Sequence, residues 1–476
     1  MRYDPKPMKK LFFNFTLILM LLIAANSWAP LSYAKEAKEK VFNAKTHQLE
    51  NGLQIIVIEN PRVPVITHMI WYRVGAADEP QGQSGIAHFL EHLLFKGQKH
   101  EKLGSLKPGE FSKIIRSLGG NDNAFTSQDY TAYFQSIASQ HLETVMTMEA
   151  GRMQGLNVPE EDVLSENKVI QEERRQRTEN KPEALLDEQL REALFANHPY
   201  SIPVIGWQHE IQSLTRAQIM AFYNTYYAPN NAILVVSGDV KAQEVFETAK
   251  RTYGLMENRE TPKRLRTTSP PFRGTSTITL SDKNVQQPQF RKIFRVPSYK
   301  QSAKESLALQ VLEEIMGAGS SSRFYQDLVV KQKIATSAGL SYSSDSWNDG
   351  SLRVWVTPAP GISFDNIENS VNNALGNLVK NGVTDDELSD AITRLQAEAI
   401  YALDSVAGPA MVIGYSLITG STLDDIEYWP EHIGAVTKEQ IQAAAKTYLN
   451  PDAPYKNPPV IGYLMPETEN NSGAIK

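Results

Sequence analysis

One apolar segment, residues 85–95, constrains this 476-residue chain more than any other part of the sequence. It reads Gly-Ile-Ala-His-Phe-Leu-Glu-His-Leu-Leu-Phe, and its run of large apolar side chains predicts a helix that is buried on nearly all sides. His88, Glu91 and His92 are three or four residues apart, so they share one face of that helix. Polar groups on a buried helix need partners, because an unpaired buried polar group costs free energy.

A metal ion would satisfy the two histidines. Imidazoles four residues apart on a helix can bind one Zn²⁺. The alternative is a pair of core histidines bonded to backbone carbonyls, but with 9 His in the chain the pattern H-x-x-E-H arises by chance in about one such sequence in a hundred. The chain has no Cys, so every metal ligand must be nitrogen or oxygen. A hydrolytic zinc site uses three protein ligands and one open position, and a third ligand is therefore expected elsewhere.

A second helical pattern, over residues 160–177, offers carboxylates for this third position. Val169 and Ile170 define its apolar stripe. Glu166 and Glu173 fall close to the centre of the stripe, whereas Glu172 lies roughly 110° away. Both inward carboxylates need a counter-charge, which Zn²⁺ would provide. The alternative is that both are structural acids paired with neighbouring arginines, Arg174, Arg175 or Arg177.

Strands and helices alternate along the first half of the chain. The Asn51-Gly52 pair between alternating apolar runs predicts a hairpin. Further apolar patterns predict strands at 65–74, 124–126, 130–137 and 232–239, and helices at 111–118 and 142–153. Residues 256–274 have no periodicity and contain three prolines, as is typical of a linker.

The second half repeats the order of strands, long helix and strands. Strands are expected at 276–280, at 289–296 and near 339 and 354, and helices at 303–316 and near 364 and 385. The sequence therefore predicts an α+β protein of two similar domains, each a mainly antiparallel sheet flanked by helices. The predicted divisions are residues 35–258 for the metal-bearing domain, 259–274 for the linker and 275–476 for the second domain.

The N-terminus carries an export signal rather than part of the fold. Lys9 and Lys10 precede an apolar stretch at 11–25, and Ser32-Tyr33-Ala34 has small residues where a signal peptidase cleaves. We therefore expect residues 1–34 to be a signal peptide and the mature protein to be periplasmic or secreted. The alternative, an uncleaved membrane anchor, is disfavoured because the apolar run is short for a bilayer span. A net charge of -6 makes nucleic acid an unexpected partner.

These motifs resemble the pitrilysin or insulinase-type zinc peptidases, the inverzincins, near the branch of bacterial and mitochondrial-processing-peptidase subunits. The resemblance rests on H-x-x-E-H together with residues 123–126, 166–175, 198–200, 204–207, 226–232 and 238–240. It implies two domains that face each other across a cleft. It also implies zinc on His88, His92 and Glu173, a catalytic base at Glu91, and Glu166 as an acid beside the ligand histidines.

The resemblance also implies how a peptide binds. In the family a substrate adds to the edge strand formed here by Asn123, Ala124, Phe125 and Thr126, with backbone paired to backbone. An ordinary edge strand is the alternative.

A second feature of the family is missing. Many members carry an Arg and, seven residues later, a Tyr that reach the substrate across the cleft, and the alignment of Ser321 to Leu328 places Val329 and Thr336 there. Losing one donor to a developing oxyanion costs about 10²–10³ in rate in other hydrolases. A homologous partner subunit that supplies the Arg/Tyr pair explains the gap better than a substitute among residues already in the chain, Arg323, Tyr325 or Tyr342.

Two functions follow from these residues. The first is a zinc-dependent endopeptidase that hydrolyses peptides or unfolded segments with metal-activated water. The alternative is a zinc-retaining, non-catalytic subunit or peptide-binding module that needs a homologous partner. Neither function calls for nucleic acid, nor for stable membrane insertion once the signal is cleaved.

Overall fold

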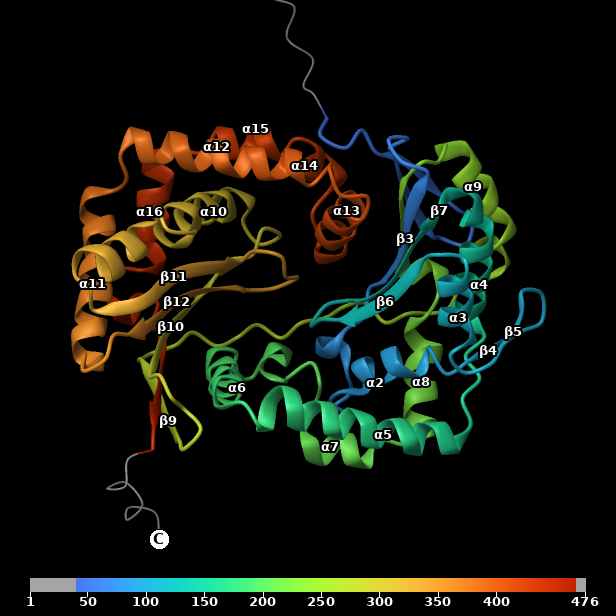
Figure 1. Cartoon of the computed structure of the whole chain (residues 1–476), viewed down its shortest axis with the longest axis horizontal. Helices are drawn as coiled ribbons and strands as arrows, with labels where there is room; N and C mark the ends of the chain where they lie inside the picture. The colour runs from blue at the N-terminus through green and yellow to red at the C-terminus, as the bar shows by residue number, and fades with distance from the viewer. Residues whose placement is uncertain (1–39, 468–476) are drawn as a thin grey trace, which may run out of the picture. The chain divides into compact units, whose positions relative to one another are not determined.

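Two sheets organise residues 40–467, which are the residues that the computed structural model describes (Figure 1). The first sheet has the strand order β1-β2-β8-β3-β7-β6. Its strands are β1 (Lys45–Gln48), β2 (Gln54–Glu59), β3 (Val65–Tyr72), β6 (Asn121–Thr126), β7 (Thr131–Ala138) and β8 (Ala232–Gly238). β1 and β2 form the predicted hairpin, and only the β2–β8 pair in this sheet is parallel. The predicted signal peptide, residues 1–34, lies outside the described residues.

Helices cover one face of this sheet because their apolar sides and its buried side chains form a common core. They are α2 (Ile86–Leu93), α3 (Glu110–Ser117), α4 (Leu142–Gln154), α5 (Glu160–Arg174), α7 (Gln208–Ser213), α8 (Arg216–Tyr226) and α9 (Ala242–Arg251). A small hairpin of β4 (Gln98–His100) and β5 (Gly104–Leu106) follows α2. The predicted helix at 160–177 ends as an α-helix at Arg174 and continues as a π-helical turn, Arg175–Glu179.

The second sheet has the order β11-β12-β10-β13-β9, with only the β13–β9 pair parallel. Its strands are β9 (Ser276–Asp282), β10 (Gln289–Val296), β11 (Ala335–Ser343), β12 (Gly350–Pro358) and β13 (Val460–Pro466). Helices α10 (Ala303–Gly317), α11 (Phe364–Asn381) and α16 (Lys438–Tyr448) pack on it, and α12 (Asp385–Tyr401), α14 (Leu423–Glu427) and α15 (Trp429–Gly434) complete this half (Figure 1). The predicted α+β class with two similar, mainly antiparallel sheets is thereby confirmed.

Each half covers, with one helix, the face of the other half's sheet that is opposite that sheet's own helices (Figure 1). α13 (Gly408–Thr419) packs on β3 and β8 of the first sheet, and α6 (Pro182–Leu194) packs on β9 and β13 of the second. Gly414 makes the first contact possible, since a Cβ there would come within 2.1 Å of Trp71. The two halves are therefore joined by apolar packing as well as by the chain between them.

The segment predicted as a linker, residues 259–274, has no helix or strand. It is nevertheless attached to the first half, because Arg264 and Arg266 form buried ion pairs with Asp78, and Arg266 also pairs with Asp129. The proposed division into residues 35–258, 259–274 and 275–476 remains a prediction. Within the described range, none of the helices combines the length and apolar composition that a bilayer crossing requires.

Candidate metal centre

The helix that carries the H-x-x-E-H pattern, α2, is held in place at its N-terminus. Gly85 precedes it with a φ of 86°, and a Cβ at this position would come within 2.5 Å of the Ile205 carbonyl oxygen. The Glu79 carboxylate accepts hydrogen bonds from the backbone N–H groups of Gly85 and Ala87, each at 2.9 Å. These contacts satisfy N–H groups that a helix start leaves free, and they fix the direction of the helix.

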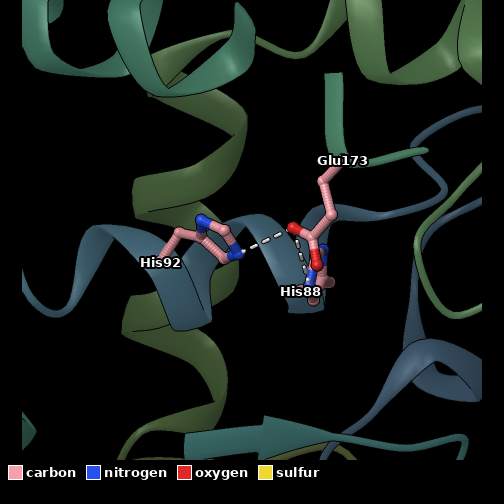
Figure 2. A group of neighbouring side chains, drawn as sticks. All are labelled: His88, His92 and Glu173. Carbon is pink, nitrogen blue, oxygen red and sulfur yellow. Dashed lines mark ion pairs between the residues drawn. The ribbon is translucent and has the colours of Figure 1, made fainter. Parts of the chain in front are cut away.

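Three side chains from two helices converge beside α2 (Figure 2). His88 and His92 come from α2, and Glu173 comes from α5. Glu173 Oε2 lies 3.3 Å from His92 Nε2 and 3.8 Å from His88 Nε2, and one candidate ligand atom from each residue lies within 4.8 Å of the others. Two imidazoles and one carboxylate are a donor set that suits Zn²⁺. The structure thus brings together the three residues that the resemblance implies as ligands.

Glu166, the other inward acid, contacts His92 from the opposite side. Its Oε1 lies 2.9 Å from His92 Nδ1, which leaves the Nε2 atom of that ring directed toward Glu173. A carboxylate on the distal ring nitrogen fixes the tautomer and orientation of a metal-binding histidine. Lys96 Nζ, at 2.5 Å, pairs with Glu166 Oε2. Sequence reasoning missed Lys96, although its position four residues after His92 is a signal that could have found it.

The apolar stripe predicted for α5, which placed Glu166 and Glu173 inward, was wrong for one of its two defining residues, Val169. Ile170 is fully buried, but Val169 is 49% exposed, so the buried face of α5 runs through Val163 and Ile170 instead. Glu166 still lies on this face, because it is four residues before Ile170. Glu172 points to solvent and pairs with Arg175, as its predicted angle requires.

The alternative that Glu166 and Glu173 are structural acids paired with arginine is found for one contact only among the described residues. Glu173 Oε1 pairs with Arg177 Nη1 at 2.9 Å, while Oε2 faces the histidines. Arg174 pairs with Glu179 and Glu188 and does not contact either acid. One oxygen of Glu173 is therefore engaged by arginine, and the other remains free to face the two imidazoles.

The electrostatics of the two histidines differ. Burial, with the nearby charge of His92, lowers the pKa of His88 to about 4, so His88 is neutral near pH 7 and one of its ring nitrogens can act as a ligand. Burial opposes charge on His92 too, but hydrogen bonds to Glu166 and Glu173 outweigh it and raise the pKa of His92 to about 9. Without a metal, the two carboxylates therefore hold a proton on His92. A divalent cation would take over the role of that positive charge.

Glu91 lies on α2 between the two histidines and faces strand β6. The hydroxyl of Thr126 donates a 2.6 Å hydrogen bond to Glu91 Oε2. Burial raises the pKa of Glu91, and the Thr126 hydrogen bond opposes this shift. A carboxylate with a raised pKa is suited to exchange protons near neutral pH. Asn123, Ala124, Phe125 and Thr126 all lie on β6, which forms the edge of the first sheet and pairs only with β7 among the described strands.

Comparison with known proteins agrees with this arrangement. Residues 54–207 match the family model of the insulinases, peptidase family M16, and residues 213–395 match the model of the M16 inactive domain. The zinc protease PqqE of Helicobacter pylori is 31% identical over 401 residues, which cover 83% of this chain and 88% of that protein. The chain belongs to peptidase family M16.

Other M16 relatives extend this result. A zinc protease of Mycobacterium leprae, ML0855, is 29% identical over 409 residues, covering 84% of this chain and 88% of that protein. A crystal structure of a Helicobacter pylori protease superimposes with a TM-score of 0.81 at 29% identity, covering 88% of this chain and 99% of that chain. The first half of the periplasmic protease PqqL of Escherichia coli shares the fold, with a TM-score of 0.73 at 19% identity over 91% of this chain and 93% of that one.

Two of the three side chains that could substitute for the Arg/Tyr pair, Arg323 and Tyr342, already have partners in the second half. Arg323 pairs with Glu387 at 2.6 Å and also donates to the Gly382 carbonyl. The buried Tyr342 hydroxyl donates to the Pro297 carbonyl at 2.5 Å. Both side chains are therefore occupied by contacts within the second half.

Val329 and Thr336, the residues that the sequence resemblance is expected to align with an Arg/Tyr pair, make ordinary structural contacts. Val329 packs against the core of the second half, and the Thr336 hydroxyl donates to the Thr357 carbonyl. Neither side chain carries a charge, and both are shorter than Arg or Tyr.

Proposed function

We propose that this chain is a zinc-dependent endopeptidase that hydrolyses peptides or unfolded segments of proteins. The observation that carries the proposal is the convergence of His88, His92 and Glu173 next to Glu91. One candidate ligand atom from each of His88, His92 and Glu173 lies within 4.8 Å of the others, and this spacing and donor set suit one zinc ion. The family membership and the names of the relatives support the same reaction.

Each residue has a distinct role in this proposal. His88, His92 and Glu173 would hold the zinc, and Glu166 orients His92 through its Nδ1 atom. When bound there, zinc would supply Lewis-acid chemistry toward the peptide carbonyl and the attacking water. Glu91 accepts a proton from water and returns it to the leaving amine. Thr126 restrains the Glu91 carboxylate by donating to one of its oxygens.

The substrate would bind as an added strand on β6. The free edge of β6 presents backbone N–H and C=O groups, and an extended peptide can pair with them. Thr126 joins this strand directly to Glu91, so a peptide on β6 lies next to the proposed base. Affinity would come mainly from backbone hydrogen bonds, and specificity from the pockets on either side.

A second candidate function is that of a non-catalytic subunit, and it rests on residues of the second half. The sequence resemblance is expected to align Val329 and Thr336 with the family's Arg/Tyr pair, and Arg323 and Tyr342 are engaged in other contacts. The chain would then be a zinc-retaining subunit or peptide-binding module that depends on a homologous partner with Arg and Tyr in that register.

A turnover experiment separates the two functions. We expect cleavage of a quenched fluorescent peptide by the purified mature chain together with its homologous partner, abolished by a chelator and restored by Zn²⁺. The chain alone should cleave weakly or not at all, because on the expected alignment it lacks the Arg and Tyr that would hold the peptide across from the metal. Full activity of the monomeric chain alone, unaffected by Arg323→Ala and Tyr342→Phe, would show that no partner is required. Zinc binding without turnover in any mixture would favour the non-catalytic subunit.

The export of the protein is also part of the proposal. Lys9 and Lys10, the apolar stretch at 11–25 and Ser32-Tyr33-Ala34 support cleavage after Ala34 and a periplasmic or secreted location. Mass spectrometry of the native protein should find Lys35 at the N-terminus in the extracytoplasmic fraction. An intact N-terminus in the membrane fraction would instead identify an uncleaved anchor.

A further inference from the structure

A cavity of about 460 Å³ lies where the predicted linker meets the first half. Its walls include Arg73 at the end of the first sheet's strand β3, Asp78, and the linker side chains Lys263, Arg264 and Arg266. Trp347, from the loop before β12, lines it as well. The cavity is separate from the metal centre, and nothing in the proposed peptidase reaction uses it.

Two carboxylates, those of Asp78 and Asp129, form ion pairs with the linker arginines. Asp78 lies 2.6 Å from Arg266 Nη1 and 3.5 Å from Arg264 Nη2. Asp129 lies 3.0 Å from Arg266 Nη2, and its second oxygen accepts from the Tyr200 hydroxyl and the Trp347 backbone N–H. Both carboxylates are therefore already shared among several donors.

The third guanidinium at the cavity, that of Arg73, has no carboxylate partner in the described part of the chain. Arg73 donates only to the Ala232 carbonyl and to the Gln54 side chain, at 3.4 and 3.1 Å. Burial, together with the charge of Arg264, lowers the pKa of Arg73 to about 10. Buried charges are normally paired, because desolvation of a lone charge is costly. Arg73 is thus a positive charge that the cavity wall leaves uncompensated.

The linker arginines are also incompletely satisfied. The Arg264 side chain is 9% exposed and the Arg266 side chain 4%, yet Nε and Nη1 of Arg264 and Nε of Arg266 have no hydrogen-bond partner within residues 40–467. Lys300 adds another positive charge, with its Nζ 3.6 Å from the centre of the Trp347 ring. Even with Glu79, which also lines the cavity, counted as charged, the positive groups outnumber the acids.

We infer that this cavity is a binding site for a small oxyanion, a phosphate or a carboxylate, held by Arg73, Arg264 and Lys263. Guanidinium groups match the geometry of these anions and bind them with paired, charge-assisted hydrogen bonds. A cation would be repelled, and an apolar ligand would leave the arginine N–H groups without partners. Because Arg73 belongs to the first half and the other two residues to the linker, a bound oxyanion would tie the linker to the first half.

Titration with inorganic phosphate tests the site directly. Isothermal calorimetry at constant ionic strength should detect phosphate binding to the full chain, and phosphate should raise the midpoint of thermal unfolding more than chloride does. Arg73→Gln should weaken phosphate binding by about 10-fold to 100-fold, the loss expected for one charge-assisted pair. In phosphate-free buffer the same variant should be at least as stable as the wild type, since it removes an uncompensated charge. A purely structural Arg73 would instead make the variant less stable.

Two further variants and two peptides complete the test. Lys263→Gln changes an exposed side chain at the cavity and should also weaken phosphate binding. This variant keeps the inference testable even when Arg73→Gln does not fold. Arg62→Gln is the matched control, because Arg62 pairs with Asp404 outside the cavity. Competition by a peptide with a free carboxyl terminus, but not by its amidated form, would assign the site to peptide carboxylates; no competition would assign it to free phosphate. Equal effects of phosphate and chloride, or unchanged phosphate binding in both variants, would overturn the inference.

Discussion

Glu91→Gln is expected to keep near-stoichiometric zinc while peptide hydrolysis falls by about 10²–10⁴-fold. The carboxylate is not part of the His88, His92 and Glu173 group, so its neutralisation should leave metal binding nearly intact. Gln has the same shape, and its amide oxygen can still accept the 2.6 Å hydrogen bond from Thr126. The variant therefore removes the ability to take up a proton and changes little else.

Metal analysis beside a peptide-cleavage assay measures both quantities on the same preparation. His88→Ala and His92→Ala should lose zinc and hydrolysis together, because each removes a proposed ligand. Glu101→Gln changes an exposed carboxylate outside the metal-binding group and should alter neither. If Glu91→Gln still cleaves at close to the wild-type rate in the active assembly, the assignment of the base is wrong.

The local structure could be predicted where periodicity is strong. The hairpin around Asn51-Gly52 and the buried helix α2 were predictable because turn chemistry and an unbroken apolar run leave few other structures. The end of α2 was less predictable. The predicted helix ran to about residue 95, whereas α2 ends at Leu93. The apolar run continues through Leu94 and Phe95, and the first glycine, Gly97, comes four residues after Leu93, so the sequence does not mark the exact end.

Contacts between distant segments could not be predicted. The packing of α13 on the first sheet depends on Gly414 meeting Trp71, more than 300 residues away in sequence, and no local pattern encodes that pairing. The ion pairs of Arg264 and Arg266 likewise occur in a segment whose composition indicated only a linker. Val169 shows the limit of a stripe drawn from two residues, because an apolar side chain can remain at the surface.

Glu173→Gln is expected to weaken zinc binding severely, and more than any other single substitution on α5. The amide replaces a charged oxygen that lies 3.3 Å from His92 and 3.8 Å from His88. Glu166→Gln should have an intermediate effect of about 10–100-fold, the usual cost of losing a group that orients a metal-binding histidine. Glu172→Gln should hardly change zinc affinity, since its carboxylate points to solvent and pairs with Arg175.

The order of these three effects can be measured by competition with a chromophoric chelator, with circular dichroism as a check on folding. Glu173→Gln also breaks the ion pair with Arg177, so Arg177→Ala is the matched control: it removes the same pair and leaves the carboxylate in place. The Arg177 side chain is 71% exposed, and exposed pairs contribute little to stability, so the control should fold and retain most of its zinc affinity. A severe loss of zinc in Glu172→Gln, with Glu173→Gln unaffected, would reject Glu173 as the third ligand. Equal losses in Glu173→Gln and Arg177→Ala would mean that the ion pair, and not the carboxylate facing the histidines, maintains the site.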